Sequence, residues 1–197
     1  MHSQIIDVSY GCSVRLTDGS LMILGGMIKV RLRVISRIAS NLHANNAPIT
    51  QGGFNNKPET DNPTFEFYPP KGNGLPIYSH FLHQALNSNL FPHTAALPNG
   101  LIFVAANRLA MLYNWKTNTE RRLPSFPNGV RVNYPASAGA VLLPLTIQNN
   151  WTPEVLLCGG TKANVDGLAT QLSSQYPASA QCMFILISAY SLTSSWV

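Results

Sequence analysis

Three segments of the chain share one pattern: a turn, then a short apolar run, then a pair of small residues. They read LTDGSLMILGG (16–26), LPNGLIFVAAN (97–107) and PEVLLCGG (153–160), the last keeping only the strand and the pair. Asp-Gly and Asn-Gly supply the positive φ angles of a tight hairpin turn. The runs are apolar on both faces, which is typical of strands buried between neighbouring layers. Glycine pairs allow backbones to approach closely at a strand end.

The spacing of these segments predicts the architecture. Their strands end at Leu24, Val104 and Leu157, which are 80 and 53 residues apart. A four-stranded propeller blade takes roughly 40–50 residues, so one interval fits a blade and the other fits a blade with additional length. We therefore predict an all-β fold, a partial kelch-like β-propeller, with residues 1–197 forming one incomplete domain.

Two further segments have the character of outer blade strands. They are TFEFY (64–68) and AMLYNWKTNTERRLP (110–124), and each leads into polar turn residues or proline. Pro69 and Pro70 remove two backbone donors in succession, so the first of these strands must end there. Its residues Glu66 and Tyr68 are predicted to lie at the surface or to pack between blades rather than to carry chemistry. Helical pattern is confined to an amphipathic turn or two within 76–89.

Composition favours a secreted all-β protein over a helical or disordered one, because only 11% of residues are charged while there are 14 Gly and 14 Pro. The net charge of +5 is local: without Lys29, Arg31, Arg33 and Arg37 it falls to +1. We therefore expect no nucleic-acid partner. The basic run 28–50 is either a cationic arm for an anionic surface or a solvated insertion without a partner.

Targeting signals are sparse. No apolar stretch reaches the ~20 residues needed to span a bilayer, and the first 13 residues lack the regions of a secretory signal peptide. The three cysteines allow one disulfide and one free thiol. Asn150-Trp151-Thr152 is a sequon, which makes Asn150 a glycosylation candidate.

Several consecutive pieces of the chain resemble the fungal glyoxal oxidases, which are copper-radical oxidases related in architecture to galactose oxidase. The resemblance covers roughly residues 9–27 and 52–187. It is carried by GGFNNKPETDNPTFEFYPP, AMLYNWKTNTERRLPSFPNGVRVNYPAS, VLLPLTIQNNWTPEVLLCGG and QLSSQYPASAQC. It implies a secreted, seven-bladed propeller, of which this chain holds about three blades. The activity it implies is oxidation of small aldehydes such as glyoxal and methylglyoxal to carboxylic acids, with O₂ reduced to H₂O₂.

The resemblance also isolates one segment. In the family, the strand that ends in a glycine pair leads almost directly into the loop that reads GGFNN here. In this chain, some two dozen residues separate Gly26 from Gly52. We therefore interpret residues 28–51 as an insertion or as an artefact of the gene prediction, such as translated intron.

The resemblance implies a copper site with two tyrosines and two imidazoles, a donor set that suits Cu(II). One tyrosine is crosslinked to a cysteine and forms the radical, so the protein supplies part of its own cofactor. Tyr10 precedes Asp18 by eight residues, as the crosslinked tyrosine of the family precedes its Asp-Gly turn. Tyr10 is thus the candidate radical-forming residue and copper ligand, although Val8 and Ser9 depart from the family pattern. The alternative is a tyrosine that begins a strand with its ring half-buried.

The other members of that site have no match in the sequence. In the family the crosslinking cysteine lies upstream of this segment. Cys12 shares a strand face with Tyr10 about 6.5–7 Å along the strand, so a direct bond would require local distortion. No Tyr-His dipeptide is present, whereas the second tyrosine of the family adjoins a histidine. We therefore expect the copper site to be incomplete, with no copper bound and no activity in this chain alone.

Other candidates have weaker patterns. His80 and His83 have the i, i+3 spacing of one helical face, but two ligands make a poor metal site. Given a secreted propeller, Cys158 and Cys182 could pair, or Cys158 could be a small buried hydrophobe. A different class of function is a non-catalytic propeller-type binding module, for example for surface glycans. A partial propeller also leaves open blade edges, so self-association is expected.

Overall fold

The computed structural model confirms the predicted fold class. It describes residues 8–9, 11–25, 27–29, 51–52, 58–86, 88, 90–134, 136–163, 175–187 and 196. Regular structure in these ranges is antiparallel strand, apart from the α-helix α2 (His80–Gln84) and the 3-10 turn η1 (Pro127–Gly129). The helix lies within the segment 76–89, where the sequence predicted a helical turn.

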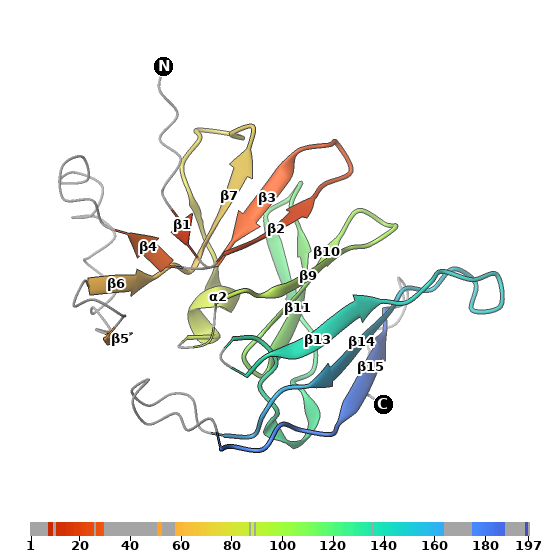
Figure 1. Cartoon of the computed structure of the whole chain (residues 1–197). Helices are drawn as coiled ribbons and strands as arrows, with labels where there is room; N and C mark the ends of the chain where they lie inside the picture. Colours follow the sequence, from red (N-terminus) through yellow and green to blue (C-terminus); the bar gives the residue numbers. More distant parts are fainter. Residues whose placement is uncertain are drawn as a thin grey trace.

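Three sheets follow one another along the chain and have the form of propeller blades (Figure 1). The first blade has the strand order β2 (Cys12–Arg15), β3 (Leu21–Leu24), β7 (Thr64–Tyr68), β8 (Ile77–Tyr78). The second contains β9 (His93–Ala96), β10 (Ile102–Ala106), β11 (Leu109–Asn114) and β12 (Thr119–Arg122). The third contains β13 (Ala138–Leu142), β14 (Glu154–Gly159) and β15 (Cys182–Leu186). The three recurring apolar segments are β3, β10 and β14, the second strand of each blade.

A fourth sheet combines β1 (Val8–Ser9), which precedes the first blade, with three strands from the segment between β3 and β7. Its order is β1, β4 (Met27–Lys29), β6 (Pro58–Asp61), β5 (Gln51–Gly52). The predicted insertion 28–51 begins in β4 and ends in β5, and its residues 30–50 lie outside the described residues. Its interpretation as an insertion therefore stays a prediction.

Strand β10 lies between two apolar cores. Ile102 and Val104 pack in the core between the first and second blades, whereas Phe103 and Ala105 pack in the core between the second and third. Successive side chains of a strand point to opposite faces, so a strand covered on both sides must be apolar at every position. All five residues of β10 are buried, as the uninterrupted apolar run predicted.

The first and third blades are covered on one face only by the described residues. In β14, Val155 and Leu157 are buried while the residues that alternate with them are partly exposed. On the same outer side of the third blade, Val141 is 51% exposed and Leu186 is 40% exposed. The sequence of these strands is apolar on both faces, but in the described structure only the face toward the second blade is buried.

Strand β7 ends at Tyr68, immediately before the two prolines, as predicted. Phe65 is fully buried, and its ring centroid lies 4.6 Å from that of Tyr113 in the second blade. Tyr68 is exposed and Glu66 is half-buried. These positions agree with surface and packing roles for both residues.

The first strands of the three blades, β2, β9 and β13, begin at the same end of the molecule, which we call the leading end. There, Cys12 Sγ lies 3.9 Å from Thr94 Oγ1, and His93 Nε2 lies 3.1 Å from the carbonyl oxygen of Val132, shortly before β13. The strands finish at the opposite end, the hairpin end, where the turns β2–β3, β9–β10 and β13–β14 lie (Figure 1). Lys71 of the first blade pairs with Asp18 at this end.

Gly160 follows β14 at the leading end and illustrates why a small residue is needed after the strand. Its φ is +82°, and a Cβ at this position would collide with the carbonyl oxygen of Arg131. The backbones of Arg131 and Thr161 exchange two hydrogen bonds beside it, of 2.9 and 3.1 Å. The second glycine of the pair thus allows the strand end to approach the neighbouring loop, as the sequence predicted.

Replacing Gly160 by Ala should destabilise the fold, because the side chain meets backbone and the left-handed conformation becomes strained. We expect the free energy of unfolding to fall by about 2 kcal/mol or more, measured by urea unfolding. Gly139→Ala in β13 is the matched control, since a Cβ added at that residue would have no neighbouring atom within 4 Å. Equal stability of the two variants would contradict the role assigned to Gly160.

Candidate functional site

At the leading end, the first strands of two blades bring a thiol beside a hydroxyl. Cys12 begins β2 and Thr94 lies in β9, and the Cys12 thiol donates to Thr94 Oγ1. Burial raises the pKa of the Cys12 thiol to about 12. At neutral pH the thiol is therefore protonated, so it is a poor nucleophile and a poor metal ligand.

A buried asparagine joins the loops at this end. The Asn133 side-chain amide donates to the carbonyl oxygens of Ser88 and Leu90, each at 2.8 Å. Its oxygen accepts from the backbone N–H of Asn107 at 2.6 Å. Asn107 in turn donates from its side chain to the carbonyl of Ala85 at 3.2 Å. These bonds satisfy polar backbone groups that lie between blades, so Asn133 holds the neighbouring loops together.

A buried cation lies in the same region. Arg131 is 2% exposed, and its guanidinium donates from Nη1 to the carbonyl oxygen of Ala163 at 2.8 Å. Burying a charge is costly without hydrogen-bond partners, and the Ala163 carbonyl supplies one such partner. The contact joins the segment after β14 to the loop before β13. Sequence analysis did not single out Asn107, Arg131 or Asn133, since their importance depends on carbonyl groups far away in the chain.

Among the described residues, His80 and His83 of α2 belong to no group of three potential metal ligands. His80 and His83 are exposed, and their ring centroids lie 5.1 and 5.8 Å from that of Tyr78. The nearby carboxylate of Glu120 accepts instead from the Ser79 hydroxyl, at 2.6 Å, and from the helix backbone. His80 and His83 thus form a surface aromatic cluster with Tyr78, beside a helix that is capped by Ser79.

Tyr10 lies outside the described residues, so its roles as radical-forming residue and copper ligand stay predictions. Within the described ranges, no group of three or more His, Cys, Asp or Glu side chains comes together. We derive no chemical step through copper from the described residues. In the same ranges, no helix has the length and apolar character needed to cross a bilayer.

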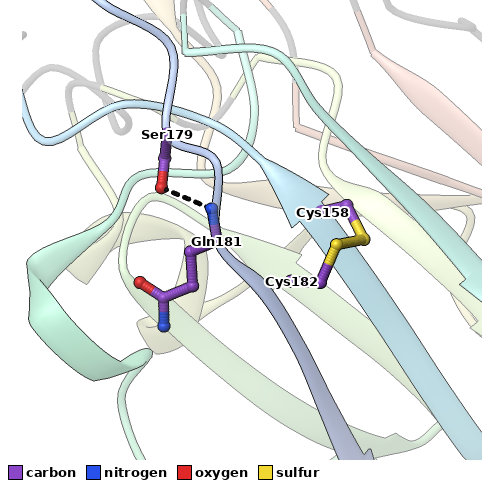
Figure 2. Close-up of a disulfide and its surroundings, with 4 residues drawn as sticks. All are labelled: Cys158, Ser179, Gln181 and Cys182. Atoms are coloured by element: carbon purple, nitrogen blue, oxygen red, sulfur yellow. Dashed lines mark hydrogen bonds between the residues drawn. A yellow bond between two sulfur atoms is a disulfide. The ribbon is translucent and has the colours of Figure 1, made fainter.

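Cys158 and Cys182 form a disulfide (Figure 2). The two residues are directly opposite each other in β14 and β15, so the bond joins adjacent strands of the third blade. Beside it, the Gln181 backbone N–H donates to Ser179 Oγ at 3.1 Å (Figure 2). The pairing left open by the sequence is therefore present, and Cys12 is the free cysteine.

Comparison with known protein families shows to which family these blades belong. Residues 44–197 match the family described as Glyoxal oxidase N-terminus. The match covers more than half of the chain, and the chain belongs to this family.

Curated relatives carry aldehyde-oxidase names. The chain is 32% identical over 122 residues to "Aldehyde oxidase GLOX" of Vitis pseudoreticulata. The aligned region covers 59% of this chain and 22% of the relative. It is 34% identical over 134 residues to "Aldehyde oxidase GLOX1" of Arabidopsis thaliana, covering 63% and 22%. It is 36% identical over 100 residues to "Putative aldehyde oxidase Art an 7" of Artemisia annua, covering 49% and 15%. The chain thus aligns with about a fifth of the length of these relatives.

Removing the disulfide should destabilise the third blade, because the crosslink restricts the unfolded chain across a sequence separation of 24 residues. We expect the double variant Cys158→Ser/Cys182→Ser to lose about 3–4 kcal/mol of unfolding free energy. Urea unfolding measures the change, with the wild-type chain as the reference. Unchanged stability in the double variant would show that the crosslink does not constrain this region.

The Cys12 thiol should resist alkylation in the folded chain. With a pKa of about 12, the folded thiol stays protonated at pH 9, where the unfolded thiol, with an ordinary pKa of 9.0, is half ionised. Stability from this difference is present below pH 9 and declines as the pH rises toward 12. Iodoacetamide labelling at pH 9 should therefore be slow in buffer and fast in urea, with Cys12→Ser as the blank. Equal rates would refute the burial of this group.

Proposed function

We propose that this chain corresponds to the N-terminal part of a copper-radical oxidase. Such an enzyme converts small aldehydes, such as glyoxal and methylglyoxal, to carboxylic acids and reduces O₂ to H₂O₂. The observation that carries the proposal is the family match over residues 44–197. The aldehyde-oxidase names of the relatives support the same class of substrate.

The open faces of the first and third blades support a larger ring. The partly exposed apolar side chains of β13, β14 and β15 form an outer face suited to a further blade. An exposed apolar sheet face of this kind is also a surface for association with other chains. We infer that the isolated chain associates with itself through these faces.

Within this proposal, Tyr10 would hold the copper as one of its ligands and would supply the phenol that forms the radical. Only Gly11 separates it from Cys12, which lies at the leading end beside Thr94. The first strands of neighbouring blades approach one another at that end, where a ring would close around its axis. The sequence contains no Tyr-His pair, so the other ligands are not supplied by a motif within these residues. We therefore infer that the 197 residues alone do not oxidise aldehydes.

Secretion is the compartment that fits this function. The Cys158–Cys182 disulfide supports it, because disulfides persist in oxidising compartments and are rare in the cytosol. Production of H₂O₂ outside the cell would also keep the oxidant away from cytosolic thiols.

The test uses two proteins loaded with Cu(II): this chain and the product of the complete transcript, sequenced before codon 1 and past codon 197. With methylglyoxal and O₂, we expect the complete product to form H₂O₂ and carboxylate in equal amounts and this chain to form none. Tyr10→Phe should abolish H₂O₂ formation by the complete product, since a phenylalanine can neither bind copper nor form the radical. Tyr68→Phe, at an exposed position of β7, is the matched control.

Three outcomes would count against the proposal. Oxidation by this chain alone would contradict its inferred inactivity. Full activity of the Tyr10→Phe product would remove Tyr10 from the site. A copper-loaded complete product that binds glycans but oxidises no aldehyde would favour the non-catalytic binding module.

A further inference from the structure

The loop of residues 143–153 connects β13 to β14 and extends away from the sheets at the hairpin end (Figure 1). Its shape is determined by its own hydrogen bonds. The Asn149 side chain donates to the Thr152 carbonyl at 3.1 Å and to Glu154 Oε1 at 3.0 Å, and the Trp151 N–H donates to the Thr146 carbonyl at 2.9 Å. The loop therefore contains a compact turn that is closed between Thr146 and Trp151, with residues 147–150 between them.

Asn150 in this turn is exposed, and no hydrogen bond of its side chain is found within the described structure. Its φ of 54° is one that asparagine adopts with little cost. Trp151 has a φ of 57°, which is unusual for a bulky residue. The loop thus exposes the side-chain amide of Asn150 and keeps the neighbouring tryptophan in a conformation that ordinary turns avoid.

The same loop exposes two large apolar side chains. Ile147 is 75% exposed and Trp151 is 55% exposed. The Asn150 N–H donates to the Ile147 carbonyl at 3.0 Å, so the turn brings the backbone of Ile147 close to Asn150, and Trp151 is the next residue along the chain. Exposed apolar side chains in one loop favour a cover, because burying them removes apolar surface from water.

We propose that Asn150 carries an N-linked glycan whose first sugar covers Trp151 and Ile147. In the attachment step, Asn150 Nδ2 attacks the anomeric carbon of a lipid-diphosphate-linked oligosaccharide. The bond between carbon and the diphosphate oxygen breaks, a new carbon–nitrogen bond forms, and the amide loses one proton. Thr152 supplies the hydroxyl that the sequon requires. The glycan would place polar sugar hydroxyls toward water and a sugar face over the indole ring.

The chain offers a clear contrast to this site. Asn62-Pro63-Thr64 has the same outer residues, but proline occupies its middle position and Asn62 is buried. Asn150-Trp151-Thr152 is the one sequon without proline in the 197 residues. A single modified position is therefore expected.

The location is compatible with the proposed oxidase and does not depend on it. Asn150 follows β13 at the hairpin end, whereas Cys12, His93 and Thr94 lie where the first strands begin. A glycan at Asn150 would therefore project from the end opposite to those residues. Failure of this inference would leave the aldehyde-oxidase proposal unaffected, and the converse also holds.

The test is translation of the full chain behind a cleavable secretory leader in the presence of endoplasmic-reticulum microsomes. Protease protection identifies the translocated chains, whether or not they fold well. We expect these chains to migrate more slowly by the mass of one oligosaccharide and to lose the shift on treatment with peptide N-glycosidase. Protected chains that show no shift would overturn the proposal.

Matched variants locate the modification. Asn150→Asp and Thr152→Ala should abolish the shift, because the first removes the nucleophilic amide and the second removes the hydroxyl. Thr152→Ser keeps a hydroxyl and should keep the shift. A shift that survives in Asn150→Asp would assign the glycan elsewhere and contradict the proposal.

Tryptophan fluorescence tests the cover over Trp151. Trp115 and Trp196 are both half-buried, so Trp151 should dominate quenching by acrylamide. We expect the quenching constant of the glycosylated chain to rise when the glycan is removed, and to reach that of Asn150→Asp, which matches the deglycosylated product. Trp151→Phe should remove the difference. An unchanged quenching constant would show that the sugar does not lie over the ring.

Discussion

The two-sided burial of β10 is the constraint on which the described structure depends. Its apolar side chains face the first blade and the third blade in turn, so one strand belongs to both cores. Removing either neighbouring blade would expose half of that strand to water, at a cost proportional to the apolar area uncovered. The central blade therefore determines how the other two are placed. Strand β14 has the corresponding position in the third blade, but only one of its faces is buried, so its other face is open among the described residues.

Polar contacts between loops hold the blades together in addition to the apolar cores. The loops at the leading end must cross between blades, where their backbone groups lose contact with water, and Asn133 and Arg131 supply the missing partners. Gly160 permits one of these approaches because it has no side chain. At the hairpin end, the corresponding contact is made at the surface, where Lys71 pairs with Asp18 and lies 4.6 Å from the ring centroid of Trp115. The buried polar contacts thus lie at the leading end, and the solvent-exposed ion pair lies at the hairpin end.

The parts of the fold that were predictable are those with local causes. The run at 102–106 is apolar at every position and was therefore predicted to be buried on both faces, and the prolines after Tyr68 end β7 where their missing donors require. The spacing of His80 and His83 is also local and indicated one helical face. It could not indicate that Tyr78 would pack against both rings, or that Glu120 would be engaged by the helix. The family resemblance identified Tyr10, but its geometry lies outside the described residues.

The sequence by itself determined the strand pattern, the turns and the family, because these depend on periodicity, on Gly and Pro, and on ordered motifs. It left open the partner of Cys158, which the structure shows to be Cys182 in the neighbouring strand. It also contained no sign that Asn133 would connect loops more than 40 residues away in the chain. Only the tertiary structure decided these points. The free energy of a disulfide or a buried hydrogen bond depends on which distant groups the packed sheets bring within bonding distance.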